Sequence, residues 1–450
     1  MRHSITSEEQ YNRMMLEPIP KLIVSLAIPT VVSMMITVIY NTADTYFVSQ
    51  INKSAAAAVG AVYAIMAIIQ AAGFGLGMGA GSLISRLLGQ KRNDEADLYG
   101  SSALFAAFFF GLFISAFGLA FLQPFLRLLG CSDTMMPYAE PYAKYILLAA
   151  PISCSTFVLN NILRCEGKSA LAMIGMGGGG LLNMALDPIL IFNFHLQTGG
   201  AALATAISQC FSFLLLSWQF VRRRTVVQIK VKYVSRSIRD YGLILATGLP
   251  TIFRQGLASL ASAVLNRNAV QYGDATVAAV TISGKIYMFL RNFVIGVGQG
   301  FQPVAGYNYG AGNKKRTWQA FRFATLLGTA VCIISAALVG VYAEPLMAWF
   351  SDDREVIELG CTALSFFAAV TPLLAFSTFV NLLYQCLGFK APATFLASCR
   401  QGIFFVPGVY ILNFLLGRTG VLAAQSVADL LTCVISVPFI VVFYRKYLKT

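Results

Sequence analysis

The sequence predicts an all-α polytopic membrane protein with twelve transmembrane helices in two parallel six-helix repeats. Three observations support this fold class. Only 12% of the 450 residues are charged and 57% are hydrophobic, whereas a water-soluble domain has about 25% charged residues. Apolar runs such as 103–122 reach the ~20 residues that a helix needs to cross a bilayer. The second half of the chain also repeats features of the first at one fixed offset.

The apolar segments divide the chain into twelve expected spans in order. They are 21–47, 55–84, 98–122, 138–163, 169–193, 198–221, 240–266, 275–304, 318–342, 356–386, 391–415 and 420–444. Lysine and arginine gather in the loops of one side, with Arg222, Arg223 and Arg224 opening the longest of these loops. Because cytoplasmic loops carry the excess of basic residues, both termini are expected in the cytoplasm.

A shift of 221 residues superimposes unusual residues of the two halves without gaps. AIPT (27–30) falls on GLPT (248–251), and NNILRCEG (160–167) falls on NLLYQCLG (381–388). Six spans per half start both halves on the same membrane side, so the repeats are parallel and related by an axis along the membrane normal. We expect an N-terminal lobe over 1–221, a basic cytoplasmic linker over 222–239 and a C-terminal lobe over 240–450.

Composition excludes several other classes of protein. The basic residues behind the net charge of +14 lie mainly in the loops on one side of the membrane. Their distribution is thus explained by membrane topology, and nucleic acid is not an expected partner. Residues 1–17 lack the apolar core of a cleavable signal. The nine cysteines have no paired spacing and there are only two histidines, so we expect no metal site and no cofactor.

Three carboxylates lie well inside expected spans, at Asp44, Asp187 and Asp429. An intramembrane acid costs several kcal/mol unless it is paired, hydrated or protonated, which makes it a functional candidate. At 1.5 Å per residue, Asp44 and Asp187 lie roughly 35 and 27 Å along outward-running helices, in the outer half of the membrane. Asn183 shares a helix face with Asp187, and Thr205 begins an inward-running span at the same depth.

The two acids of this set are absent from the second half. The offset places Leu265 opposite Asp44 and Gly408 opposite Asp187. Packing features such as glycines are duplicated, so this asymmetry favours a site. Two neighbouring carboxylates in a low dielectric repel and therefore favour a shared proton or, with amide and hydroxyl oxygens, a small hard cation such as a transient Na⁺.

Structural roles remain open for each acid. Asp187 would then cap a helix broken at Pro188, and Asp44 would pair with tyrosines such as Tyr40 or Tyr46. Asp429 has two open roles, a structural pair with Arg400 and a part in transport. Prolines within spans, such as Pro29 and Pro250, mark either static kinks or hinges.

The second half contributes basic groups inside its spans, Arg254, Lys285 and Arg291. One interpretation is that they snorkel or pair with carbonyls. The other is that they form a positive wall of a second-lobe cavity that suits an anionic substrate.

Several motifs resemble those of one transporter family. They are AIPT (27–30), ADTYFVSQ (43–50), GMGAGSLISRLLGQK (77–91), NMALDPILIF (183–192), GGAALATAISQ (199–209) and GFQPVAGYNYGAGN (300–313). With twelve spans in two repeats, the whole chain resembles the multidrug and toxic compound extrusion (MATE) transporters, most of all their bacterial DinF-like and MepA-like branch.

The resemblance implies a V-shaped pair of six-helix lobes that exports drugs, often cationic, in exchange for H⁺ or Na⁺. It assigns ion coupling to a first-lobe cluster that corresponds here to Asp44, Asn183, Asp187 and Thr205, with Tyr40 and Asn160 as possible site neighbours. Some members carry acids on helices 7 and 10 of the second lobe. This chain has Arg254, Gln255 and Asn381 in those regions, so a second-lobe cation site is not expected.

We therefore expect a secondary active multidrug exporter with alternating access of its two lobes, and no enzyme. Its partners would be the lipid bilayer and small drug-like molecules, in a bacterial inner membrane and as a monomer. The alternative is a flippase of lipid-linked saccharides or other anionic lipids from the same superfamily. An intramembrane prenyl transferase would need paired acidic motifs, and the only adjacent aspartates, Asp352 and Asp353, lie in an expected outer loop. A passive channel is the remaining rival.

Overall fold

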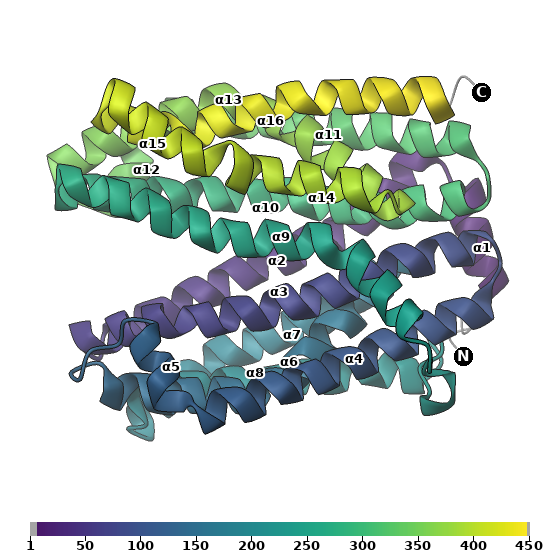
Figure 1. Ribbon diagram of the computed structural model, residues 1–450, viewed down its shortest axis with the longest axis horizontal. Coiled ribbons are helices and arrows are strands. Elements are labelled where there is room, and N and C mark those ends of the chain that lie inside the picture. The colour runs from purple at the N-terminus through teal and green to yellow at the C-terminus, as the bar shows by residue number, and fades with distance from the viewer. Residues whose placement is uncertain (1–6, 448–450) are drawn as a thin grey trace. The chain divides into compact units, whose positions relative to one another are not determined.

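The computed structural model describes residues 7–447, which are almost entirely helical and contain no strand (Figure 1). The expected cytoplasmic termini end in residues 1–6 and 448–450, outside this range. The α-helices are α1 (Ser7–Leu16), α2 (Ile19–Ser49), α3 (Lys53–Gly89), α4 (Asn93–Ala120), α5 (Leu122–Leu128), α6 (Met136–Cys165), α7 (Ser169–Pro188), α8 (Gln197–Val221), α9 (Ile238–Ala269), α10 (Asp274–Gly310), α11 (Lys314–Val341), α12 (Ala343–Ala348), α13 (Arg354–Leu387), α14 (Lys390–Ser398), α15 (Phe405–Leu416) and α16 (Arg418–Tyr447). Four short turns join them, η1 (Ile189–Asn193), η2 (Val231–Tyr233), η3 (Val270–Tyr272) and η4 (Cys399–Ile403).

Within residues 7–447, twelve helices are long and apolar enough to cross a membrane, so the twelve predicted spans are confirmed. Most helices extend past the predicted ends. The second span, for example, was expected over 55–84 and forms a helix over Lys53–Gly89. Residues 85–89, which follow the predicted span, stay helical because the backbone hydrogen bonds of a helix do not depend on contact with lipid. The short helices α1, α5 and α12 lie between or before the spans and carry no apolar run of that length.

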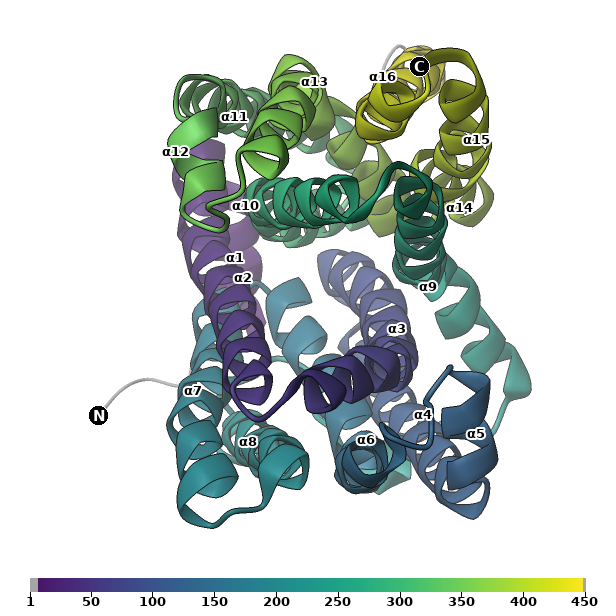
Figure 2. The same ribbon diagram turned by 90° about the vertical axis from the view of Figure 1, so that its left-hand side faces the viewer.

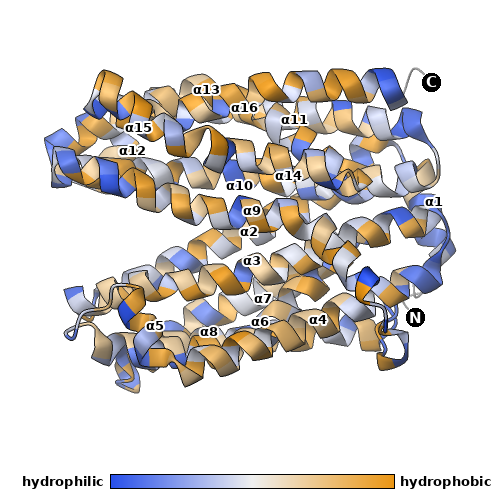
Figure 3. Cartoon of the chain, viewed as in Figure 1, coloured by the Kyte–Doolittle hydropathy of each residue, from blue (hydrophilic) through white to orange (hydrophobic). Residues whose placement is uncertain are grey.

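Apolar side chains cover the outside of the helices, as lipid requires. On α4, Phe109, Phe113 and Phe117 follow one another at four-residue intervals and are each more than half exposed. This spacing places the three rings on one helix face, and those of Phe113 and Phe117 stack on each other. Figure 3 shows this pattern across the molecule, with hydrophobic residues along the helices and hydrophilic residues at their ends and in the loops. Such a surface is stable against hydrocarbon and unstable in water.

The chain divides into two compact units. Unit 1 contains the chain up to Glu17 with Ile28–Ile252, and unit 2 contains Pro18–Ala27 with the chain from Phe253. In unit 1 the central helix is α6, which packs against α3, α4 and α8 (Figure 2). In unit 2 the central helix is α13, which packs against α10, α11 and α16. The 221-residue offset superimposes these two central helices on each other.

One side-chain hydrogen bond is duplicated with both of its partners. The Asn160 amide Nδ2 donates to the Ala172 carbonyl oxygen at 3.0 Å, and the Asn381 Nδ2 donates to the Ala393 carbonyl oxygen at 2.7 Å. Both residues of the second bond lie 221 positions after those of the first. The repeat inferred from sequence is thus a repeat of the structure, and each asparagine ties its central helix to the start of the next helix.

The units exchange the first turns of two equivalent helices. Residues 18–27 begin α2 but belong to unit 2, and residues 238–252 of α9 belong to unit 1. Close backbone contacts hold both segments, since a Cβ on Gly248 would lie 2.1 Å from the Gly75 oxygen and one on Gly300 would lie 2.6 Å from the Ala27 nitrogen. Small residues allow such close helix contacts in lipid.

The segment between α8 and α9 is held entirely within unit 1. The Glu166 carboxylate accepts hydrogen bonds from the backbone N–H groups of Val226 and Val227, at 2.9 and 3.1 Å. Asp97 accepts from the Gln228 N–H at 2.7 Å, and Lys168 donates to the Arg224 carbonyl oxygen. Apart from η2, this basic linker is non-helical, so side chains of α4 and of the α6–α7 turn satisfy its backbone groups.

Burial raises the pKa of Glu166 to about 7, although Lys168 and the two N–H groups oppose this effect. A carboxyl whose pKa is higher in the folded state stabilises the fold at low pH and loses this contribution as pH rises from about 4.5 to 7. We expect Glu166→Gln to remove this pH dependence, worth about 3 kcal/mol. Thermal unfolding in detergent at pH 5 and 7.5 measures it. Glu8→Gln, at an exposed glutamate of α1, should leave the wild-type slope unchanged, and an unchanged slope in Glu166→Gln would refute the assignment.

Candidate functional site: a polar cluster in unit 1

Three helices of unit 1 bring the predicted polar residues together. The Asn183 amide Nδ2 on α7 donates to the Asp187 Oδ1 at 3.4 Å and to the Thr205 Oγ1 on α8 at 3.3 Å. Asp187 lies within electrostatic range of Asp44 on α2. Asp187 has no exposed surface, and Asp44 is partly buried. The four residues chosen from depth along the sequence thus form one cluster in the structure.

The cluster has more hydrogen-bond acceptors than donors. Asp44 Oδ1, Asp187 Oδ2 and Asn183 Oδ1 are all buried and have no hydrogen-bond partner in the described part of the chain. Buried polar atoms are almost always paired, so unpaired oxygens at one place require an explanation. Oxygens of carboxylate and amide groups attract either protons or hard cations. The geometry therefore fits a proton or a small cation such as Na⁺.

Tyr142 on α6 is a member of this cluster that the sequence analysis missed. Its side chain is buried, its hydroxyl donates to the Met66 Sδ at 3.6 Å, and it lies within electrostatic range of both Asp44 and Asp187. Tyr40, one turn before Asp44 on α2, also lies near both Asp44 and Tyr63. Depth is consistent with Tyr142, because it lies near the outer start of an inward-running helix, but depth alone does not select it as a neighbour of Asp44.

A small cavity adjoins the cluster. Its volume is about 10 Å³, which is close to the space that one water molecule needs. Asn183 and Thr205 line it together with Ser208 and Gln209 of α8. Ser208 Oγ and Gln209 Oε1 are also buried without a hydrogen-bond partner among the described residues. Polar oxygens thus continue from the cluster into the cavity.

The helix that carries Asp187 changes form directly after it. Pro188 has no N–H, so it cannot donate to the Met184 carbonyl four residues earlier. The next residues, Ile189–Asn193, form a single π-helical turn, η1. Turns of this kind occur frequently at functional sites. The break places a freed backbone carbonyl within one turn of Asn183 and Asp187.

Asn160 does not lie in the cluster. It is 18 residues from Tyr142 on the same helix, which corresponds to roughly 27 Å. Its amide bonds Ala172 near the start of α7, and Asn381 makes the equivalent bond in unit 2. A contact kept in both halves indicates a structural role for Asn160, whereas the acids occur in one half only.

The equivalent place in unit 2 is apolar. Leu265, opposite Asp44 in the repeat, packs against a buried cluster that includes Ala261, Phe405 and Val409. Gly408, opposite Asp187, lies between the last two of these residues in sequence. Hydrocarbon side chains fill this place, so unit 2 has no counterpart of the polar cluster there.

The structure separates the three basic residues of the second half. Arg254 on α9 and Arg291 on α10 lie within electrostatic range of each other and of Arg400. Lys285 is exposed on α10 and is not among the charged neighbours of this group. Arg400 pairs with Asp429 at 2.5 Å, so the ion pair anticipated from the sequence is confirmed.

The repeat also appears in a comparison with known families. The MatE family profile matches residues 29–189 and 250–411, and the two matched segments begin 221 residues apart. The chain belongs to the MatE family. Both matches begin in the AIPT and GLPT motifs, where α2 and α9 pass from one unit to the other.

Similar proteins cover nearly the whole chain. The multidrug export protein MepA of Staphylococcus aureus is 28% identical over 432 residues, which is 96% of this chain and 95% of MepA. MepA of Staphylococcus haemolyticus is 28% identical over 95% of this chain and 94% of its own length. Among solved structures of the MatE family, an outward-facing multidrug resistance transporter matches with a TM-score of 0.92, 27% identity and coverage of 97% and 98%. A transporter from Pyrococcus furiosus matches with a TM-score of 0.91 at 27% identity, over 97% of this chain and 98% of its own.

Proposed function

We propose that this protein is a multidrug efflux antiporter that exports small organic molecules in exchange for H⁺ or Na⁺. It would act in a bacterial inner membrane, as a monomer with both termini in the cytoplasm. Its likeness to MepA along almost the whole chain supports the substrate class. The observation that carries the coupling assignment is the set of unpaired acceptor oxygens on Asp44, Asn183 and Asp187.

The chemistry of coupling follows from these oxygens. With the site empty, two carboxylates repel each other in a low dielectric, which raises the free energy of that state. A proton or a cation removes the repulsion and bonds the unpaired oxygens. Tyr142 lies near both carboxylates, while Asn183, which also donates to Thr205, orients Asp187. Loading and unloading of one ion thus changes which arrangement of the surrounding helices is stable, as an antiporter requires.

Alternating access would use the segments that the units exchange. The division between the units falls at residues 27–28 of α2 and 252–253 of α9, within two residues of Pro29 and Pro250. Each proline removes one helix hydrogen bond, which makes the helix easier to bend there. The close contacts at Gly248 and Gly300 hold the segment before each bend. We infer that bending at these two prolines accompanies the exchange of access.

Reconstituted transport tests this function. The fluorescent cation ethidium is added to proteoliposomes, and a pH gradient or a Na⁺ gradient is imposed, each in a separate experiment. One of the two ion gradients should drive ethidium transport against the ethidium gradient. The ion whose gradient drives this transport is the coupling ion. Ethidium flux that only dissipates its gradient under both conditions would exclude an antiporter and favour the passive channel.

A further inference from the structure

The segment between α8 and α9, residues 222–239, carries a concentrated positive charge. This basic linker contains seven lysines and arginines and no aspartate or glutamate. All seven basic residues are exposed, and none of them forms an ion pair with an acidic residue in the described range 7–447. The linker therefore presents cations that no acidic side chain neutralises through an ion pair.

The backbone of the basic linker is fixed against α4, at the end of unit 1 where that helix begins (Figure 1). The Ser235 N–H donates to the Ser102 Oγ at 2.8 Å. Val227 has no exposed surface and lies against Gly100, where a Cβ would come within 2.8 Å of the valine Cγ1. Together with the carboxylates described above, these contacts order the linker while its basic side chains stay exposed.

Two large apolar side chains are exposed among these charges. Val231, in η2, is 74% exposed, and Ile238, the first residue of α9, is 82% exposed. Lys232 follows Val231 directly, and Arg239 follows Ile238. Neighbouring basic and apolar side chains are typical of a segment in the membrane interface, where apolar groups enter the acyl region and cations stay among the headgroups.

The two ends of the basic linker place it at the depth of the headgroups. It joins the end of one helix that can span a membrane, α8, to the beginning of another, α9, so both ends meet the same boundary of the hydrocarbon layer. At the α8 end the Arg222 Cζ lies 4.4 Å from the centre of the Trp218 ring, and tryptophan is enriched at that boundary. The orientation proposed above makes this the cytoplasmic leaflet, whose anionic lipids attract basic segments.

We propose that the basic linker binds the phosphate groups of anionic phospholipids in the leaflet against which it lies. Lys232, Arg236 and Arg239 pair with lipid phosphates through charge-assisted hydrogen bonds, while Val231 and Ile238 contact the acyl chains. A free anion would meet only the charges, whereas a phospholipid meets the charges and the apolar side chains. Because the linker is already ordered, little entropy is lost on binding.

Native mass spectrometry of the whole protein tests this proposal. The protein is purified in a neutral detergent and mixed with anionic phosphatidylglycerol or with zwitterionic phosphatidylcholine of identical acyl chains. Wild type should bind phosphatidylglycerol more tightly. Lys232→Gln with Arg236→Gln should weaken phosphatidylglycerol binding about fivefold for each charge removed, because a basic residue near an anionic membrane surface contributes about 1 kcal/mol. Phosphatidylcholine binding should stay unchanged.

A matched double variant removes two positive charges elsewhere at the same end of unit 1. Lys91 and Arg92 are also exposed, but Arg92 pairs with Glu95, and the Lys91 Nζ lies 4.5 Å from the centre of the Tyr11 ring. Lys91→Gln with Arg92→Gln should therefore keep the phosphatidylglycerol affinity of wild type. Thermal unfolding in detergent checks that both double variants are folded.

Three results would overturn the lipid site. Equal affinity of wild type for the two lipids is the first, and it needs no variant. The second is an equal loss of phosphatidylglycerol binding in both double variants, which would assign the preference to positive charge in general. The third is displacement of bound phosphatidylglycerol by inorganic phosphate but not by chloride at equal ionic strength, which would indicate a site for a free anion. Lipid binding is measured without transport, so a failure of ion-driven export would count only against the antiporter.

Discussion

Asp187→Asn should reduce ion-driven export to the background of empty vesicles. The substitution keeps the shape of the side chain but removes the charge that an H⁺ or Na⁺ would neutralise. Asp44 then has no second carboxylate to repel, so the ion no longer changes the balance between the empty and loaded states. The ethidium accumulation described above measures the loss. Asp187→Glu, which keeps the carboxylate, should retain part of the activity.

The same variant should fold normally. Asp187 has no exposed surface, and replacing a buried charge by a neutral amide does not leave an uncompensated ion. Size-exclusion profiles and thermal unfolding in detergent should therefore match wild type. Asp133→Asn serves as the matched control, because Asp133 is an aspartate of the same unit with 95% of its side chain exposed. Uphill ethidium export by Asp187→Asn at the wild-type rate would remove the coupling assignment.

The sequence was sufficient to predict the spans and the two charged members of the polar cluster, Asp44 and Asp187. Hydropathy locates a span because the hydrocarbon of the bilayer requires apolar side chains along the whole length of the span. Asp44 and Asp187 stand out because charged residues are rare there, and counting residues from each span's start gives their depth. Asn183 and Thr205 follow from helix periodicity and from the same depth.

Residues without a charge, or with a distant partner, could not be predicted in this way. Tyr142 is one of 19 tyrosines, and only the packing of α6 against its neighbours identifies it as a partner of Asp44. The grouping of Arg254 and Arg291 with Arg400 depends on how α9, α10 and η4 pack. Spacing along one helix cannot give that packing. The π-helical turn at η4 also has no sequence signal comparable to that of a proline.

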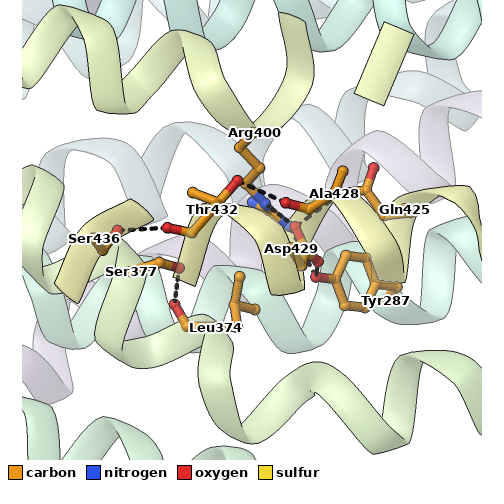
Figure 4. Close-up of polar contacts among 9 residues, drawn as sticks. All are labelled: Tyr287, Leu374, Ser377, Arg400, Gln425, Ala428, Asp429, Thr432 and Ser436. Atoms are coloured by element: carbon orange, nitrogen blue, oxygen red, sulfur yellow. Dashed lines mark hydrogen bonds and ion pairs between the residues drawn. The ribbon is translucent and has the colours of Figure 1, made fainter. Parts of the chain in front are cut away.

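The offset of 221 relates two halves that keep one scaffold but carry different polar groups. Contacts between helices are retained, as Asn160 and Asn381 show through their matching bonds. The polar groups of the two halves differ in kind and in position. In unit 1 unpaired oxygens lie around Asp187, and in unit 2 the Asp429 carboxylate accepts hydrogen bonds from Arg400, Tyr287 and Gln425 (Figure 4). The two halves thus share the contacts between their helices and differ in their electrostatic character.

Asp429→Asn should destabilise the protein by about 3–5 kcal/mol, the usual cost of removing one partner of a buried ion pair. Only 3% of the Asp429 side chain and 13% of the Arg400 side chain are exposed, so water cannot replace the lost charge. The variant leaves the Arg400 guanidinium without its carboxylate partner. Thermal unfolding in detergent should show a lower midpoint, and a chemical-denaturant series gives the free energy.

The double variant Asp429→Asn with Arg400→Gln separates the ion pair from simple packing. It keeps the formal charge of unit 2 as it is in the wild type, because one acid and one base are removed together, and it leaves no isolated ion where the pair was. Much of the lost stability should therefore return, and the two substitutions should show a coupling energy well above the 0.3–0.5 kcal/mol scatter of independent sites. Additive losses in the double variant would mean that Asp429 stabilises unit 2 through its hydrogen bonds to Tyr287 and Gln425 rather than through charge.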